Sequence, residues 1–341
     1  MPRAVILTAI PVEYQAVRTY LTGLQPNKHP RGRHYEQGTF SANGQVWDVK
    51  IAAIGPGNIG AALQTQLAIA YFNPDVILFV GVAGGIKDVR LGDVVAATKV
   101  YGYESGKAEE SFKSRANFGR STSKLEKIAR SEANINDWLE RLPLIPEPTP
   151  TVFVAPIVSG EKVVASTKSE VFQFLRSRFG DAVAVEMEGI GFLDAAHDNP
   201  QVSAMVIRGI SDLIDGKSEV DAQGYQEIAA HHASAFAFQV LAKFIVENDN
   251  KVEGVDSRVR PKAERDLLKT VKQRAYSRLH GQLHHQVKLN LTQQTQPQQV
   301  RPWSMEVKVA IAKPSQRLPP DTTIGQVFDQ CFGRLLILGE P

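Results

Sequence analysis

The sequence is poor in the features that mark secreted, membrane-spanning or repetitive proteins. Its 341 residues include a single cysteine, Cys331, so one chain can form neither a disulfide nor a cysteine-built metal site. The apolar run near the N-terminus, "AVILTAIP", is too short to cross a membrane, and no export-signal cleavage pattern follows it. No internal repeat is visible. These absences predict a protein of a reducing compartment, the cytoplasm, without a membrane anchor.

The net charge of +3 is small, but the charge is unevenly distributed. Residues 251–341 hold about 15 Lys and Arg against about 8 Asp and Glu, whereas residues 1–250 are slightly acidic. We therefore expect a domain over residues 1–248, a linker over 249–260, and a basic, mostly helical or irregular extension over 261–341. The extension lacks interleaved aromatic residues on which bases would stack, so nucleic acid is not an expected partner.

Apolar, β-branched runs alternate with amphipathic stretches up to about residue 247, which is typical of a layered α/β domain. Several of the runs are apolar almost throughout, as strands buried on both faces are. The strands expected are Arg3–Ile10, Val46–Ile54, Asp75–Ala83, Asp93–Tyr101, Thr151–Val158, Ala182–Met187 and Ala204–Ser211. The helices expected are Val12–Leu21, Asn58–Phe72, Lys168–Phe179, Glu188–Asp198 and Asp221–Val246. The polar segment 103–150 is expected to leave the sheet as a surface excursion.

Acidic residues stand where several of these strands end. Glu13 follows the first strand, Asp212 follows the last, and Glu186 and Glu188 occur in "AVEMEG", where a strand gives way to a helix. The carboxyl ends of parallel strands meet at one edge of a sheet, so these side chains are expected to converge there. Buried carboxylates need partners. Either the N-terminus of the following helix supplies them or a ligand does.

Six segments in order carry a family resemblance: "TAIPVE", "IGPGNIGAA", "PDVILFVGVAGGIKDVRLGDVV", "VSGEKVVAS", "AVEMEGIG" and "VIRGISDLID". Together they resemble the nucleoside phosphorylase and nucleosidase superfamily, and most of all the 5'-methylthioadenosine/S-adenosylhomocysteine nucleosidases. The resemblance covers residues 1 to about 246. It implies a three-layer α/β/α domain with a mixed central sheet, and hydrolysis of the N-glycosidic bond of an adenine nucleoside or nucleotide.

The resemblance also implies roles for the acids. Glu13 matches the group that activates the attacking water, and Asp212, oriented by Ser211, matches the acid that protonates the departing adenine. Glu188 matches an acceptor of ribose hydroxyls, and Glu186 is expected to face the same side. This assignment is chemically sensible, because breaking the bond builds positive charge on the sugar and negative charge on the base.

The remaining binding residues follow from the same motifs. The set expected to contact the substrate comprises Ile54, Gly55, Val82, Gly84, Val163, Val164 and Met187, with Tyr225 near the 5' substituent. No metal or cofactor is implied, because the base leaves by protonation. Members of the family often pair, so a homodimer or higher oligomer is expected.

Two departures from the family pattern bear on the reaction. Val163 stands where an aromatic residue commonly stacks on adenine, and Val82 stands where many relatives have a small hydroxyl residue. The "FVGVAGG" segment also has no arginine to hold phosphate. We therefore expect water as the nucleophile, unless Arg18 or Arg90 reaches the site. Phosphorolysis, and a nucleoside-sensing module without turnover, stay open as alternatives.

The last residues resemble a different module. "RLLILGEP" is similar to the strand and first residues of a Walker A loop in NACHT-type signalling ATPases, although the lysine and the serine or threonine that bind phosphate and magnesium are absent. The chain is therefore expected to be the N-terminal part of a larger protein. The nucleosidase domain would then be an effector, and a nucleoside triphosphatase (NTPase) domain would follow it in cis.

Overall fold

The computed structural model describes residues 1–29, 32–110, 112–215 and 224–246, which all belong to one compact unit, Met1–Asp249. The predicted linker, the basic extension and the "RLLILGEP" segment lie outside the described residues. Their assignments therefore stay predictions.

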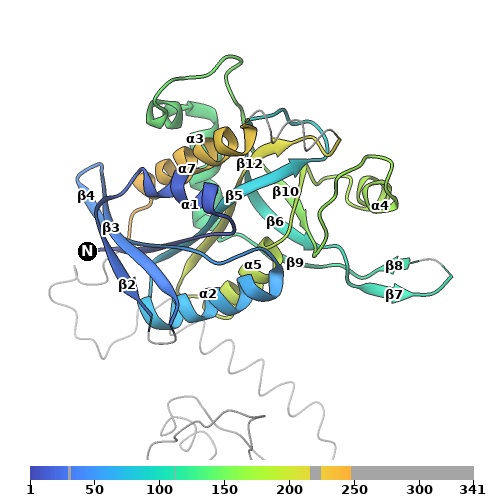
Figure 1. Ribbon diagram of the computed structural model, residues 1–341, viewed down its shortest axis with the longest axis horizontal. Helices are drawn as coiled ribbons and strands as arrows, with labels where there is room; N and C mark the ends of the chain where they lie inside the picture. Colours follow the sequence, from blue (N-terminus) through green and yellow to red (C-terminus); the bar gives the residue numbers. More distant parts are fainter. Residues whose placement is uncertain (30–31, 111, 216–223, 247–341) are drawn as a thin grey trace, which may run out of the picture. The chain divides into compact units, whose positions relative to one another are not determined.

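A ten-stranded sheet forms the centre of this unit (Figure 1). Its strands follow in the order β11-β10-β6-β12-β5-β1-β4-β3-β2, and β9 pairs with β6. They are β1 (Arg3–Thr8), β2 (Thr22–Lys28), β3 (His34–Ala42), β4 (Gln45–Ala53), β5 (Val76–Gly85), β6 (Val94–Gly102), β9 (Asn117–Arg120), β10 (Val152–Ser159), β11 (Ala184–Glu186) and β12 (Ser203–Asp212). A separate hairpin joins β7 (Gly106–Ala108) to β8 (Phe112–Ser114).

Parallel and antiparallel pairs are combined, which confirms the mixed sheet. β5 pairs in parallel with β1 and β12, whereas β12 is antiparallel to β6. β11 is parallel to β10 and antiparallel to the end of β5. The strands β11, β10, β6, β12 and β5 therefore close into a ring, and the ends of β5 and β11 lie side by side in it.

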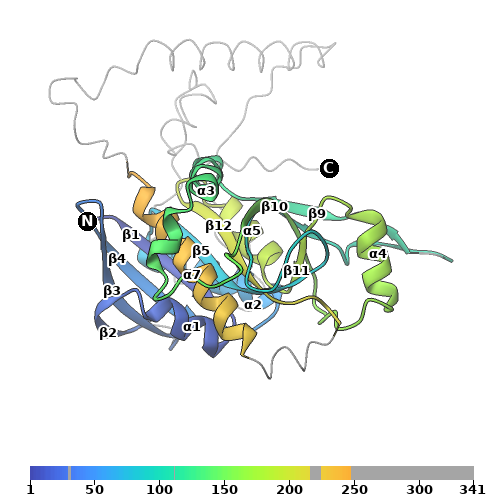
Figure 2. The same cartoon turned by 90° about the horizontal axis from the view of Figure 1, so that it is seen from above.

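Helices cover both faces of the sheet, which confirms the three-layer arrangement (Figures 1 and 2). Helices α1 (Pro11–Arg18), α3 (Ser123–Ile135) and α7 (Tyr225–Lys243) lie on one face. Helices α2 (Asn58–Phe72) and α5 (Gly189–His197) lie on the other, and α4 (Glu170–Arg178) packs on a third apolar cluster. Alanines dominate the buried side of α7, so this helix packs close to the sheet.

Three features differ from the sequence prediction. Strands β2 and β3 are not among the expected strands, because they are mixed in polarity and β2 contains glycine and proline. The segment 103–150 does not stay outside the sheet, since β9 pairs antiparallel with β6. It also contributes α3, which packs against α7. Tertiary pairing, rather than local pattern, decides the strands β2, β3 and β9.

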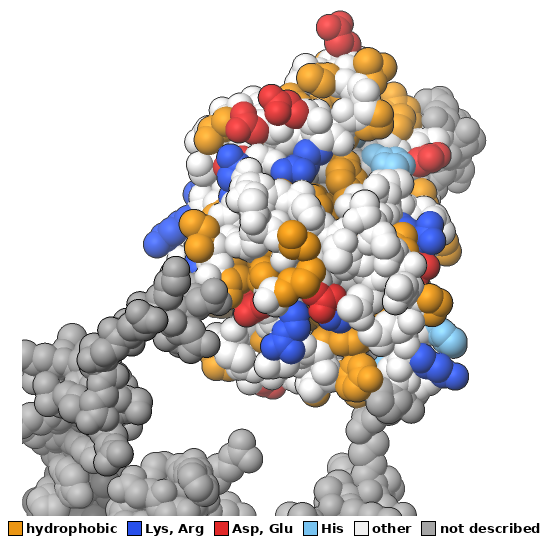
Figure 3. Space-filling model, turned by 90° about the vertical axis from the view of Figure 1, so that its left-hand side faces the viewer, with side chains coloured by type: hydrophobic (Ala, Val, Ile, Leu, Met, Phe, Trp, Pro, Cys, Tyr) orange, Lys and Arg blue, Asp and Glu red, His pale blue; other side chains and the backbone are white. Residues whose placement is uncertain are grey.

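The described surface carries charges of both signs. On the face in Figure 3, basic and acidic side chains are interspersed with apolar ones rather than gathered into separate patches. Among the described residues, no helix is both long and apolar enough to cross a membrane.

Candidate active site

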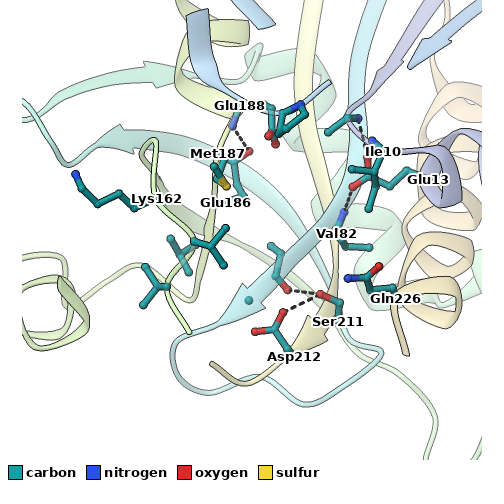
Figure 4. Close-up of a pocket in the computed structure, with 17 residues that line it drawn as sticks. Ile10, Glu13, Val82, Lys162, Glu186, Met187, Glu188, Ser211, Asp212 and Gln226 are labelled. Atoms are coloured by element: carbon teal, nitrogen blue, oxygen red, sulfur yellow. Dashed lines mark hydrogen bonds between the residues drawn. The ribbon is translucent and has the colours of Figure 1, made fainter. Parts of the chain in front are cut away.

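One pocket lies at the carboxyl ends of the central strands β1, β5 and β12 (Figure 4). The loop before α4 and the turn from β11 into α5 complete its walls. The described residues that line it are Ala9, Ile10, Glu13, Pro56, Val82, Ala83, Gly84, Lys162, Val163, Val164, Val185, Glu186, Met187, Glu188, Ser211, Asp212 and Gln226. In Figure 4 the three glutamates lie on one side of this pocket, and Ser211 and Asp212 lie on the other.

Glu13 is held by backbone donors from two strand ends. It occupies the first turn of α1, and its Oε2 accepts hydrogen bonds from the N–H groups of Ala9 (2.7 Å) and Ile10 (3.0 Å). Its Oε1 accepts one from the N–H of Val82 at 2.8 Å. The side chain is almost fully buried. Three donors on two oxygens fix the carboxylate in a single orientation.

Arg208 is the centre of the acidic side and was not predicted from the sequence. It lies on β12, is fully buried, and its Nη2 contacts the carboxylates of Glu186 and Glu188, the latter at 2.9 Å. Its Nη1 lies 4.0 Å from Glu13 Oε1, and Nη1 and Nε have no hydrogen-bond partner among the described residues. The guanidinium also lies 4.6 Å from the ring of Phe79. A charge within the apolar strand "AMVIRGIS" was the available signal.

Gly81 makes the approach between Arg208 and Glu13 possible. It pairs directly with Arg208 across the β5–β12 ladder. A Cβ at position 81 would overlap both Arg208 Nη1 and Glu13 Oε1. A side chain at this position would therefore displace Arg208, Glu13 or both.

Glu186 and Glu188 have different hydrogen-bond partners. Glu186 accepts hydrogen bonds from the N–H groups of Glu188 and Gly189, so it satisfies the start of α5. Glu188 occupies the N-cap position of that helix, but its side chain makes no capping hydrogen bond. Its carboxylate instead accepts from the N–H of Gly57 at 3.1 Å and contacts Arg208. Both glutamates line the pocket, but Glu186 is held by the start of α5 and by Arg208, whereas Glu188 is held by Gly57 and Arg208.

Burial governs the protonation of this cluster. It raises the pKa of Glu188 to about 7, although the Arg208 guanidinium opposes the shift. Burial also raises the pKa of Glu13, again against Arg208 and the three backbone donors. Burial disfavours the charge of Arg208, but the carboxylates around it outweigh this and raise its pKa. With all groups ionised, three carboxylates face one guanidinium, so the cluster carries excess negative charge.

Asp212 and Ser211 form the opposite wall. The ladder between β12 and β5 shifts register between Ile210 and Asp212, as at a β-bulge, which re-aims side chains. Ser211 Oγ donates to Asp212 Oδ2 at 3.0 Å, and the N–H of Ile214 donates to Oδ1 at 3.1 Å. The carboxyl group is fully buried. A Cβ at Gly84 would lie 3.0 Å from Asp212 Oδ1, so a glycine leaves room for it.

Residues 162–164 supply the third wall. The side chain of Val163 is exposed, whereas that of Val164 is buried. Lys162 is the only lysine or arginine among the described lining residues, and its ammonium group pairs with Glu104. Arg18 pairs instead with Glu36, and Arg90 with Asp93. Neither of these arginines lines the pocket.

Three residues predicted to bind substrate do not line this pocket. Ile54 is buried in the apolar core on the α2 side, and Gly55 turns the chain with a positive φ of 86°, so that Pro56 reaches the pocket instead. Tyr225 begins α7, and the next residue, Gln226, faces the pocket. The other predicted binding residues and both predicted catalytic acids line it.

Comparison with known proteins identifies relatives of this chain among the nucleosidases. A curated relative, ATP nucleosidase Cap17 of Escherichia coli, is 27% identical over 257 residues, covering 67% of this chain and 49% of the relative. The 5'-methylthioadenosine/S-adenosylhomocysteine nucleosidase of Staphylococcus aureus is 28% identical over 197 residues, covering 55% of this chain and 78% of the enzyme. The chain thus spans about half the length of the Cap17 relative.

A solved structure shows the same fold. The 5'-methylthioadenosine/S-adenosylhomocysteine nucleosidase of Neisseria meningitidis, in complex with methylthio-immucillin-A, aligns with a TM-score of 0.59 and 22% identity, covering 72% of this chain and all of that one. These relatives and neighbours are nucleosidases, which are N-glycosyl hydrolases. The family model described as the phosphorylase superfamily matches residues 3–246. The chain therefore belongs to the phosphorylase superfamily.

Proposed function

We propose that this domain hydrolyses the N-glycosidic bond of an adenine nucleoside or nucleotide and releases adenine. One observation carries the proposal: a single pocket has a buried cluster with excess negative charge on one side and a buried carboxyl group, Asp212, on the other. Cleavage of a glycosidic bond develops positive charge on the sugar and negative charge on the leaving base. The two walls match those two charges.

On the sugar side, Glu13 acts as the general base. Its raised pKa makes it a better proton acceptor than an ordinary glutamate, once it is ionised. Its backbone donors and Arg208 hold the carboxylate in place, and Oε1 keeps one acceptor position for the proton of the attacking water. Glu188 accepts hydrogen bonds from sugar hydroxyls, and Met187 contacts the ring beside it.

On the base side, Asp212 acts as the general acid. It must be protonated when it acts, and the proton passes to a ring nitrogen of the departing adenine. Ser211 and the N–H of Ile214 keep the carboxyl group from rotating. The backbone of residues 163–164 reads the edge of the base. Val163 gives a smaller stacking surface than an aromatic residue would, so binding depends more on these polar contacts.

Water is the favoured nucleophile. A phosphate dianion needs cationic partners, and Arg18 and Arg90 are paired outside the pocket. Lys162 is paired with Glu104, and Arg208 is surrounded by carboxylates. Phosphate would also meet the excess negative charge of the glutamate cluster. Phosphorolysis is therefore the second candidate, and a non-catalytic nucleoside sensor is the third.

The larger setting is also part of the proposal. The resemblance of "RLLILGEP" to the start of a Walker A loop supports an effector role for the domain, joined in cis to a NACHT-type NTPase. We expect this protein to act in the cytoplasm as a homodimer or higher oligomer. The relatives indicate two candidate substrate types, ATP and the thioether nucleosides. The start of α7, which brings Gln226 to the pocket, is where these 5' substituents are expected to bind.

A substrate panel tests the proposal. Methylthioadenosine, S-adenosylhomocysteine, adenosine, inosine, AMP and ATP are each incubated with the protein, with and without phosphate, and base release is followed by chromatography. We expect adenine release without phosphate and no gain when phosphate is added. Release that requires phosphate would reassign the protein as a phosphorylase. Tight binding of a nucleoside without any release would favour the sensor.

The pH profile provides a second prediction. Catalysis needs Glu13 and Glu188 ionised, and burial raises the pKa of Glu188 to about 7 and also raises that of Glu13. As the pH falls, these carboxylates take up protons well before an ordinary glutamate would. We expect kcat/KM to fall roughly tenfold per pH unit below about 7. Circular dichroism at each pH controls for unfolding, and a flat profile down to about pH 5 would contradict the assignment.

A further inference from the structure

A strained turn follows the proposed proton donor directly. Ile214 has a φ of +73°, a conformation that β-branched residues rarely adopt. The N–H of Asp215 donates to the carbonyl oxygen of Leu213 at 2.9 Å, so these three residues form a γ-turn centred on Ile214. This backbone conformation aims the N–H of Ile214 at Asp212 Oδ1. Such strain persists only where surrounding contacts enforce it.

Two contacts enforce this turn. The side chain of Ile214 is fully buried in the apolar cluster that also contains Val164 and Val185. The second contact is a clasp between Asp215 and Thr167: Asp215 Oδ1 accepts from the N–H of Thr167 at 2.8 Å, and Oδ2 accepts from its hydroxyl group. Asp215 itself does not line the pocket.

The clasp joins two walls of the pocket. Thr167 lies three residues after Val164, in the segment that we assign to the base edge, and Asp215 lies three residues after Asp212. A surface aspartate that only anchored a loop would need no strained residue between itself and the pocket. Here the strained residue donates to Asp212 on one side and is held by the clasp on the other.

We propose that Asp215 is a positioning residue for proton transfer, which through its clasp with Thr167 holds the Ile214 turn and thereby the carboxyl group of Asp212. This inference rests on the proposed function, because it assumes that Asp212 protonates the leaving base. Without the clasp, Ile214 relaxes towards an ordinary backbone conformation and its N–H leaves Asp212 Oδ1. The carboxyl group then rotates away from the base while the sugar side stays intact.

The variants Asp215→Ala and Thr167→Val test the clasp. For adenine release we expect kcat to fall about 10- to 100-fold with KM changed by less than about threefold, since a small misplacement of a reacting group costs this much. Asp215→Asn, which keeps an acceptor for the N–H of Thr167, should recover most of the loss. Asp181→Ala is the matched control, because Asp181 is also a partly exposed aspartate bound to a hydroxyl group, that of Tyr101, away from the pocket.

A substrate with a different leaving group distinguishes a positioning role of Asp215 from a general loss of pocket structure. 4-Nitrophenyl riboside releases a stable phenolate that needs no protonation, so its cleavage should be unchanged in Asp215→Ala. An equal loss on both substrates would overturn the inference, because the clasp would then support the whole pocket. So would an unchanged adenine release in both variants while the wild type is active. A wild type that releases no adenine from any nucleoside would overturn the proposed function, and this inference with it.

Discussion

Replacing Asp212 by asparagine is expected to lower the rate of adenine release by about 100- to 10,000-fold, the usual contribution of a positioned general acid. The change is nearly isosteric. The amide oxygen can still accept from the N–H of Ile214, and the amide nitrogen can donate to Ser211 Oγ, so the hydrogen bonds with these two residues are kept. Only the transferable proton is lost. Steady-state kinetics on the preferred nucleoside measure the effect.

The matched control is Asp93→Asn. Asp93 is equally buried and accepts hydrogen bonds from the N–H groups of Arg90 and Thr151, but it does not line the pocket. The Asp93→Asn variant should be less stable, but each folded molecule should release adenine at the wild-type rate. Undiminished adenine release from Asp212→Asn would show that the proton comes from elsewhere. A wild type that binds nucleosides without turnover, and an Asp212→Asn variant that binds them equally well, would favour the sensor.

Replacing Arg208 by methionine is expected to cost about 3–5 kcal/mol of unfolding free energy, since it leaves buried carboxylates without their cation. Glu186 and Glu188 lose a direct partner and Glu13 loses its nearest positive charge. Adenine release should fall as well, because the glutamates must then take up protons to remain buried. Chemical denaturation measures the first effect, and kinetics on the folded fraction measures the second.

The change of unfolding free energy with pH distinguishes the loss of the Arg208 charge from a simple loss of packing. Without the guanidinium, the folded state binds protons at these glutamates more tightly than the unfolded state does, so its stability rises as pH falls. The difference in unfolding free energy between wild type and Arg208→Met should therefore shrink as the pH is lowered from about 8 to about 5. Lys50→Met is the control, because Lys50 is a buried cation paired with Asp48 outside the pocket. The Lys50→Met variant should retain activity. A loss of unfolding free energy in Arg208→Met that grows as the pH falls would contradict the charge argument.

The central strands and the acidic residues of the pocket could be predicted from the sequence for a physical reason. Strands buried on both faces leave continuous apolar runs, and the ends of those runs locate Glu13, Glu188 and Asp212, which all line one pocket. Arg208 was overlooked because its role depends on Gly81 in the neighbouring strand, a pairing that no local pattern reveals. The left-handed turn at Ile214 was equally hidden, since an isoleucine gives no sign of a positive φ.

The closure of the strand ring has a consequence for how the protein is made. β11 joins β5 through pairs such as Ala184 with Gly85, about a hundred residues apart along the chain, and contacts this distant form late and slowly in folding. Glu186 is the last residue of β11 and Glu188 follows it closely. Arg208 and Asp212 come later, in β12. A growing polypeptide therefore carries Glu13 long before it carries Arg208 or the other carboxylates of the pocket. During translation, Glu13, Arg208 and Asp212 can meet only after the ribosome has passed Asp212, so a nascent chain that ends before this residue lacks the proposed proton donor.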